Sequence, residues 1–247
     1  MSELINVENL SKSYGKKKAL DNINLKINKG KVIGILGENG AGKTTLIKLI
    51  AGLSRKDSGN IKINNIDIGF DTHKYISYMP DKFKFYDWMK VQDAIENYQV
   101  LFDDFDNIKA EFLCNKLKLN KNDLIKSLST GMKERVMIML TFSRSASIYL
   151  LDEPIGGIDP VAKDMILKTI LSVTNDISSI ILSTHLIKDI EKILDEVIFI
   201  KEGKIKVSTS SDKIREEYNK SIEEYYLEVM QNDWFNKIRF KKCMEKN

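Results

Sequence analysis

Apolar and polar residues alternate in two short runs near the start of the chain, over residues 4–7 and 23–27. This period of two is typical of strands that expose one face, so we expect an antiparallel pair with a turn around Tyr14 and Gly15. Residues 32–36 form an unbroken apolar run, which predicts a strand buried on both faces. Apolar residues then follow at helical spacing, at Leu46, Ile47, Leu49, Ile50 and Leu53. The pattern therefore predicts a strand, a loop and a helix in direct succession.

The pattern changes twice in the next part of the chain. Residues 61–79 are rich in strand-forming residues, whereas residues 81–127 are helical in pattern and acidic. We interpret the second segment as a helical insertion, and we expect a helical subdomain at about residues 81–145.

Strands and helices alternate after this insertion. Strands are expected over residues 148–151 and 179–183, and helices are expected from Met132, Val161 and Ile187. Such alternation predicts a parallel sheet with helices on its faces.

The last two expected strands, over residues 197–200 and 204–207, are close enough in sequence to form a hairpin. We therefore expect one domain over residues 1–210 and a helical extension over residues 211–247.

The extension divides into two parts by composition. Residues 214–230 predict a docking helix, and residues 232–247 carry five basic residues against two acidic ones, with Trp234, Phe235 and Phe240 among them. A basic and aromatic tail can lie on an anionic membrane surface or pack on protein, and we favour packing.

Composition narrows the class of protein. The chain has 247 residues, 43% of them hydrophobic, which is enough for a sizeable core. A net charge of +4 without a basic stripe gives no reason to expect a nucleic-acid partner. Cys114 and Cys243 have neither zinc-site spacing nor the density of a disulfide framework, so we expect a reducing, cytoplasmic setting. We find no signal-peptide pattern and no apolar run near the roughly 20 residues of a membrane span.

A glycine-rich loop with the sequence GENGAGKTT occupies residues 37–45, between the buried strand and the helix. Its backbone N–H groups and the helix amino terminus would face phosphate groups, with Lys43 at the β and γ phosphates and Thr44 on magnesium. An ordinary glycine-rich turn is the alternative, and the strand and helix context argues against it. The expected nucleotide-binding residues are Gly37, Asn39, Gly40, Ala41, Gly42, Lys43, Thr44 and Thr45.

Two acids close the apolar strand at residues 148–151. An acid at this place has no core-building role, so Asp152 is a candidate magnesium ligand, directly or through water. Glu153 is a candidate for polarising an attacking water. A strand-end cap is the alternative for one such acid, but the glycine-rich loop in the same chain makes it improbable.

A further turn, LSTGMKER, starts at Leu128 and leads into a helix. Ser129 and Gly131 lie near the amino end of that helix, which is an anion-binding position.

Together these motifs resemble the ATP-binding subunit of ATP-binding-cassette (ABC) transporters over about residues 1–210. The resemblance is carried by GENGAGKTT, LSTGMKER, LLDEP, GGIDP from Gly156 and STH ending at His185, in this order. It implies an α/β fold, namely a P-loop NTPase ABC cassette with a RecA-like parallel-sheet core, an antiparallel β subdomain and a helical subdomain. It also implies ATP and Mg²⁺ as cofactors.

The resemblance implies roles for single residues. Lys43, Glu153 and His185 would be catalytic, with His185 on the γ phosphate. Tyr14 would stack on adenine, although an ordinary half-buried strand tyrosine is an equal alternative before the family is considered. Asp159 would lie at the contact between two cassettes, and with Pro160 it also fits a helix start.

Three positions depart from the common family pattern. Asp81 stands where glutamine is usual; it can still bind magnesium, but it adds repulsion to the γ phosphate. Thr130 and Met132 replace glycine and glutamine beside the retained Ser129 and Gly131. An acid at position 81, followed by KFKFYDWMKVQDAIENY, resembles a subgroup of bacterial exporter cassettes in which Trp88 and its neighbours face the membrane subunit. We hypothesise that Asp81 takes part in coupling.

We therefore expect an ATPase subunit at the cytoplasmic face of the cell membrane, peripherally attached. It would dimerise with a second cassette, in which Ser129 and Gly131 cap the partner's ATP, and would drive export of a peptide or antimicrobial compound through an integral membrane permease. The alternatives are a soluble mechanical cassette in translation or DNA repair, and a nucleotide-dependent regulator that hardly turns over.

Overall fold

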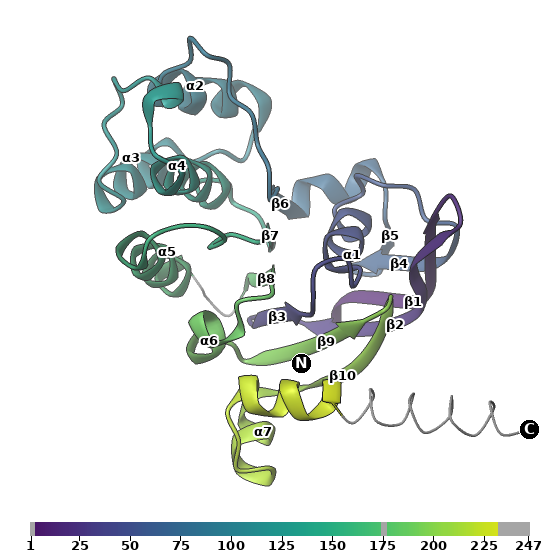
Figure 1. The fold of residues 1–247 in the computed structure, drawn as a ribbon. Helices are drawn as coiled ribbons and strands as arrows, with labels where there is room; N and C mark the ends of the chain where they lie inside the picture. The colour runs from purple at the N-terminus through teal and green to yellow at the C-terminus, as the bar shows by residue number, and fades with distance from the viewer. Residues whose placement is uncertain (1–2, 174–176, 232–247) are drawn as a thin grey trace, which may run out of the picture.

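The computed structural model describes residues 3–173 and 177–231. One of its two sheets is antiparallel, in the order β2-β1-β4-β5 (Figure 1). Its strands are β1 (Glu3–Tyr14), β2 (Lys17–Asn28), β4 (Ser58–Ile63) and β5 (Ile66–Asp67). This sheet confirms the antiparallel pair expected from the alternating residues.

The strands β1 and β2 are each 12 residues long, much longer than the alternating runs indicated. Their register shifts repeatedly, for example between Val7 and Leu10. Asn9 and Asn22 have positive φ angles of 50° and 53°, a conformation that asparagine tolerates better than most residues. Such bulges break the period of two, which is why the sequence pattern covers only part of each strand.

The second sheet has the order β10-β9-β3-β8-β7-β6. Its first five strands in sequence pair in parallel, and β10 closes the sheet as the antiparallel partner of β9. These strands are β3 (Val32–Leu36), β6 (Ile76–Met79), β7 (Ile148–Asp152), β8 (Ser179–Thr184), β9 (Glu196–Lys201) and β10 (Lys204–Ser210). The parallel sheet and the closing hairpin are confirmed.

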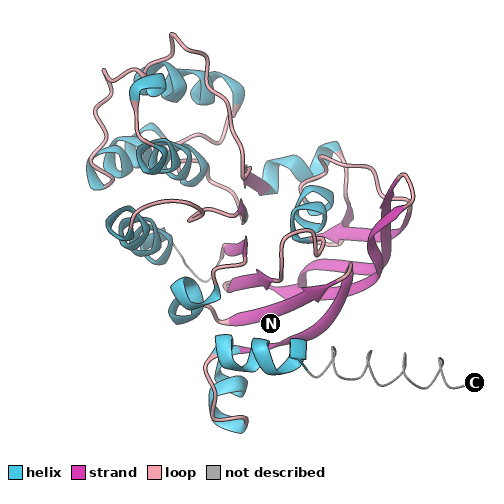
Figure 2. Cartoon of the chain, in the orientation of Figure 1, coloured by secondary structure: helices cyan, strands magenta, loops and turns pink. Residues whose placement is uncertain are grey.

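Helices surround this second sheet (Figure 2). A group apart from the antiparallel sheet consists of α2 (Val91–Leu101), α3 (Asn107–Lys116), the 3₁₀ helix η2 (Ile125–Ser127) and α4 (Thr130–Phe142). The others are α1 (Lys43–Ile50), α5 (Pro160–Val173), α6 (Ile187–Ile190) and α7 (Ser211–Glu217), with the 3₁₀ helices η1 (Phe70–Tyr75) and η3 (Glu191–Ile193). Within residues 3–173 and 177–231, no helix has the length and apolar character needed to cross a bilayer.

The expected docking helix over residues 214–230 is two helices instead of one. The first, α7, ends at Glu217, Asn219 has a positive φ of 50°, and a second helix covers residues 222–231. Ser221 and Glu224 form a reciprocal cap, since each side chain accepts a hydrogen bond from the backbone N–H of the other, at 3.1 and 2.8 Å. This cap starts a new helix within a stretch that has a continuous helical pattern. The basic tail, residues 232–247, lies outside the described residues.

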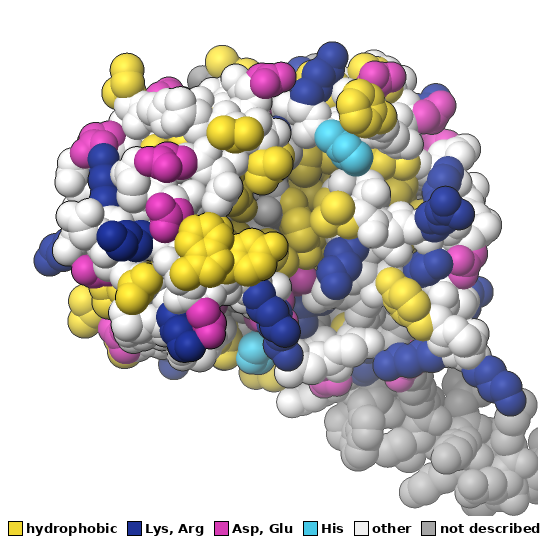
Figure 3. All heavy atoms as spheres, turned by 90° about the horizontal axis from the view of Figure 1, so that it is seen from above, with side chains coloured by type: hydrophobic (Ala, Val, Ile, Leu, Met, Phe, Trp, Pro, Cys, Tyr) yellow, Lys and Arg dark blue, Asp and Glu magenta, His cyan; other side chains and the backbone are white. Residues whose placement is uncertain are grey.

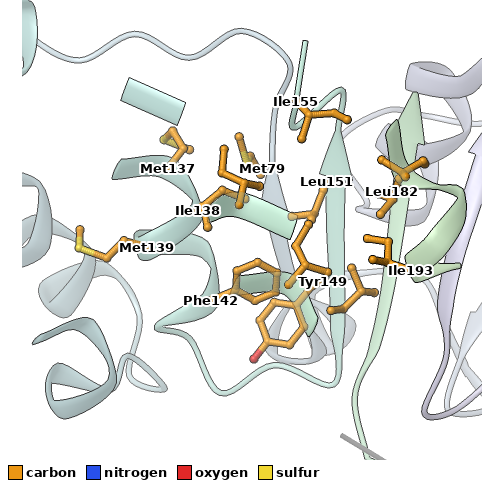
Figure 4. Packing of buried hydrophobic residues seen from close by; sticks show 14 of the residues in the cluster. Met79, Met137, Ile138, Met139, Phe142, Tyr149, Leu151, Ile155, Leu182 and Ile193 are labelled. Carbon is orange, nitrogen blue, oxygen red and sulfur yellow. The ribbon is translucent and has the colours of Figure 1, made fainter. Parts of the chain in front are cut away.

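The second sheet divides the hydrophobic core into two clusters, because successive side chains of a strand point to opposite faces. Ile33 and Ile35 face α1 and the antiparallel sheet, whereas Val32 and Leu36 face the cluster that includes α4. On that side, the Phe142 ring packs 4.9 Å from the Tyr149 ring, measured between centroids (Figure 4). The sheet is thus held rigid from both faces.

One acid is buried in this core without full compensation. Glu134 of α4 is 7% exposed, and its Oε2 atom has no hydrogen-bond partner within the described residues. Burial, with the charge of Asp81 as the smaller cause, raises the pKa of Glu134 from 4.5 to about 8. The carboxyl group is therefore mostly protonated at neutral pH, and the sequence pattern gave no sign of it.

We expect Glu134→Gln to change how stability depends on pH. The folded protein retains a proton that the unfolded chain releases above about pH 4.5, so the parent protein loses stability as the pH rises toward 8. The loss is at most about 1.4 kcal/mol per pH unit in this window. Urea unfolding at pH 5 to 9 should show that Glu134→Gln removes this slope, whereas a control, Glu216→Gln at an exposed position, retains it. Equal slopes in all three proteins would contradict the assignment.

Candidate functional site

The glycine-rich loop connects β3 to α1, and two of its glycines are required by close backbone approaches. A Cβ atom on Gly37 would lie 2.4 Å from the Ile200 carbonyl oxygen, and one on Gly42 would lie 2.6 Å from the Ala19 carbonyl oxygen. Gly42 also has a φ of 113°, which residues with a side chain rarely adopt. The loop therefore fits closely between β2 and β9.

Lys43 is the first residue of α1, and its side chain turns back over the loop. It is buried, and its Nζ donates hydrogen bonds to the carbonyl oxygens of Gly37 at 2.7 Å and Glu38 at 3.2 Å. The same atom lies 3.2 Å from Glu153 Oε1 in an ion pair. The ammonium group is thus fixed at the mouth of the loop.

Asp152 ends β7 beside this loop. Its Oδ1 atom accepts hydrogen bonds from the Thr44 hydroxyl at 3.0 Å and from the Ser183 hydroxyl at 2.6 Å. Its Oδ2 atom is buried and has no partner in the part of the chain that the structure describes. Burial raises the pKa of Asp152, although the hydrogen bonds from Ser183 and Thr44 lower it in part. A buried oxygen without a partner, next to a hydroxyl group, fits a hard cation such as Mg²⁺.

Glu153 follows in a strained conformation, with a positive φ of 51°. Its backbone N–H is held by the Ser183 carbonyl oxygen at 3.1 Å and hydroxyl at 3.2 Å. Its carboxylate lies between the imidazole of His185 and the ammonium group of Lys43. Oε2 is 3.0 Å from His185 Nδ1, and Oε1 contacts Lys43 Nζ. The three residues predicted to be catalytic therefore meet in one place.

A cavity of about 270 Å³ lies in front of this group. Asp81, from the loop after β6, and Tyr14, at the end of β1, are among its walls. The remaining lining residues are Lys17, Ala19, Asn39, Gly40, Gly42, Lys43, Thr44, Thr45 and Glu153. Gly37 and Ala41 belong to the loop but do not line the cavity. The Tyr14 side chain is 52% exposed at this edge, and its stacking on adenine stays a prediction.

The sequence reasoning missed Lys17, Ala19 and the bridging role of Ser183. Lys17 and Ala19 lie on β2, and only the pairing of Lys17 with Tyr14 across the hairpin brings them to the cavity. The three lysines of residues 16–18 were the available signal, since clustered cations next to a phosphate site favour anions.

Three predicted binding residues lie elsewhere. Ser129 caps α4, its hydroxyl accepting the Met132 backbone N–H at 3.3 Å, and a Cβ on Gly131 would lie 3.4 Å from Asp159 Oδ2. Asp159 Oδ1 in turn accepts the backbone N–H groups of residues 161 and 162 at 2.9 and 3.0 Å, which lowers the pKa of Asp159. These residues form a second group that does not line the cavity around Lys43.

The comparisons with known proteins identify the family. The ABC transporter family matches residues 20–156. The ABC transporter ATP-binding protein YtrB of Bacillus subtilis (strain 168) is 30% identical over 220 residues, covering 88% of this chain and 75% of that protein. The lantibiotic transport ATP-binding protein SrtF of Streptococcus pyogenes is 31% identical over 224 residues, covering 89% of this chain and 97% of that protein.

A solved structure of the ATP-binding subunit of an ABC transporter superposes with a TM-score of 0.82 at 27% sequence identity. The match covers 92% of this chain and 99% of that chain. The fold agrees with these matches. The chain belongs to the ABC transporter family and is an ATP-binding subunit of such a transporter.

Proposed function

We propose that this ATPase subunit dimerises on ATP and powers export of a substrate through a separate membrane permease. The proposal rests on the meeting of Lys43, Asp152 and Glu153 at one edge of the parallel sheet, beside a cavity that opens to solvent. This edge is where ligands of α/β sheets bind.

The chain's own residues supply an acid–base pair for hydrolysis. The Glu153 carboxylate would accept a proton from the attacking water as it approaches the γ phosphate. His185, 3.0 Å from Glu153 Oε2, would orient that carboxylate and donate to the γ phosphate. Lys43 would neutralise charge on the β and γ phosphates.

Thr44 and Asp152 would hold Mg²⁺, with Asp81, which lines the same cavity as Thr44, as a third ligand. The buried Asp152 Oδ2 and the Thr44 hydroxyl support this assignment because Mg²⁺ prefers oxygen ligands. The ion would neutralise charge that develops on the phosphates.

The position of Ser129, Gly131 and Asp159 outside the cavity supports a dimer. An ATP bound at Lys43 would not reach them within one chain, whereas the amino end of α4 offers N–H groups to an anion presented by a second copy. Each copy would thus complete the ATP site of the other.

Export, and attachment at the cytoplasmic face of the membrane, are supported by similarity to SrtF, whose name records lantibiotic transport. A peptide or antimicrobial cargo follows from the same similarity. The division into a domain over residues 1–210, with a helical subdomain at about 81–145, and an extension over 211–247 belongs to this proposal. A soluble mechanical or regulatory ATPase is the alternative.

An apolar cavity of about 570 Å³ lies between β6, η1 and α2, and we assign it to an amphipathic helix of the permease. Its walls include Phe70, Leu101 and Phe102, and its charged lining residues are Asp71, Lys74, Asp103, Asp104 and Arg144. Figure 3 shows hydrophobic side chains gathered in a hollow on this face of the molecule. The exposed rings of Tyr86 and Trp88 stack on the loop before α2, with their centroids 5.8 Å apart, and offer further apolar surface.

Strand β6 connects this cavity to the ATP site. Ser77 and Tyr78 line the apolar cavity, and Asp81, three residues after Tyr78, lines the cavity around Lys43. A movement of the docked helix would therefore reach Asp81 through a few backbone bonds. This short path supports the role of Asp81 in coupling.

We expect Glu153→Gln to lower the rate of ATP hydrolysis by roughly 100-fold or more, because a general base typically contributes that much. ATP binding should persist, and an ATP-dependent dimer should accumulate in analytical ultracentrifugation. Glu8→Gln, at an exposed position of β1, serves as the control and should hydrolyse ATP normally. Unchanged turnover in Glu153→Gln would refute the assignment.

We expect Leu101→Glu to lower recovery of an integral membrane protein with the tagged subunit by about tenfold, since the substitution places an unpaired charge in the apolar cavity. Its neighbour Val100 is also exposed on α2 but does not line the cavity, so Val100→Glu is the matched control. Recovery from detergent-solubilised membranes is measured by mass spectrometry, and ATPase activity of the isolated subunit should stay unchanged. Copurification of a ribosomal or DNA-repair partner instead would favour the soluble alternative.

We expect Asp81→Asn to lower the permease-stimulated ATPase rate by a factor on the order of ten, because the neutral amide is a weaker Mg²⁺ ligand than the carboxylate it replaces. Asp87→Asn, in the same loop but paired with Lys126 on the surface, is the control. Rates are measured with the subunit alone and with the permease in proteoliposomes. Unchanged ATPase and transport rates would rule out a coupling role.

A further inference from the structure

The helix over residues 222–231 packs on the outer strands of the parallel sheet, below β10 in Figure 1. The Tyr226 ring meets the Phe199 ring of β9 edge to face, with centroids 5.2 Å apart at 82°. Lys201, at the end of β9, donates from Nζ to the Met230 carbonyl oxygen at 3.1 Å. The helix is therefore fixed to β9 at two points.

Strand β9 connects this contact with the start of the glycine-rich loop. Phe199 pairs with Leu36, the last residue of β3, in the parallel register. The carbonyl oxygen of the next residue, Ile200, lies so close to Gly37 that no side chain fits between them. A shift of β9 would therefore displace the loop.

Tyr226 also faces the loop across a small cavity. This cavity of about 110 Å³ is lined by Tyr226 together with Glu38, Asn39, Gly40 and Ala41. The Glu38 carbonyl oxygen accepts hydrogen bonds from Lys43 Nζ at 3.2 Å and from the Ala41 N–H at 3.1 Å. Tyr226 thus lies beside the residue whose carbonyl oxygen helps to orient Lys43.

We propose that Tyr226 is a positioning residue for ATP binding, through which the helix over residues 222–231 keeps the phosphate loop in its binding conformation. The inference rests on the assignment of ATP to the cavity around Lys43. When the loop is already ordered, less of the binding free energy is used to order its backbone. Loss of the Tyr226 contact should therefore weaken ATP affinity more than it slows hydrolysis.

The test compares Tyr226→Phe and Tyr226→Ala in the full chain. Tyr226→Ala removes the ring contact with Phe199, so we expect a Kd for MgATP about fivefold higher, because more binding free energy is then spent on ordering the loop. Tyr226→Phe keeps the ring and should bind MgATP within about twofold of the parent. Leu227→Ala, on the same helix but half exposed, is the matched control and should bind ATP normally.

Binding is measured by calorimetry in the Glu153→Gln background, and KM and kcat are measured without that change. We expect KM to rise in parallel with Kd while kcat stays within about twofold. This is the pattern for loss of an interaction that stabilises the bound substrate and the transition state equally. A parent-like Kd in Tyr226→Ala, together with a lower melting temperature, would reduce Tyr226 to a packing residue. Lys43→Ala tests the assignment of ATP to the cavity around Lys43 separately from the role of Tyr226. If Lys43→Ala binds ATP like the parent, the ATP site and the inference about Tyr226 both fail.

Discussion

The parallel pairing of β3 with β8, and of β8 with β7, is the constraint on which the site depends. It places Leu36 beside Thr184 and Asp152 beside Ser183, so the segments that follow these strands emerge at one edge. Ser183 then contacts both acids, through its hydroxyl to Asp152 and through its backbone and hydroxyl to Glu153. The backbone register of the strands therefore brings these side chains together.

This arrangement costs free energy that the core must offset. Asp152 is buried with one oxygen lacking a described partner, and Glu153 has a left-handed backbone. Each such feature costs on the order of 1 to 3 kcal/mol. The two hydrophobic clusters on either face of the second sheet provide the opposing stability, and they leave little freedom for the strand ends to relax.

Features marked by a local sequence pattern could be predicted from the sequence, and features that depend on contacts between distant residues could not. Local patterns mark the buried strands, the glycine-rich loop and the acids at the end of β7. Their order along the chain indicated the cassette fold. The bulged parts of β1 and β2, the break after α7, and the entry of Lys17 into the cavity depend on register and on caps. Glu134 shows the same limit, because its burial follows from how α4 packs rather than from its neighbours in sequence.

The ion pair between Lys43 and Glu153 would make nucleotide binding at the proposed site an exchange of anions. Lys43 Nζ already lies 3.2 Å from Glu153 Oε1, so the phosphates of a nucleotide bound there would take the place of that carboxylate. Once displaced, the Glu153 carboxylate would lose Lys43 as its counter-ion and keep His185 as a neighbour. Nucleotide binding and release of the carboxylate proposed to act on water would then be a single event.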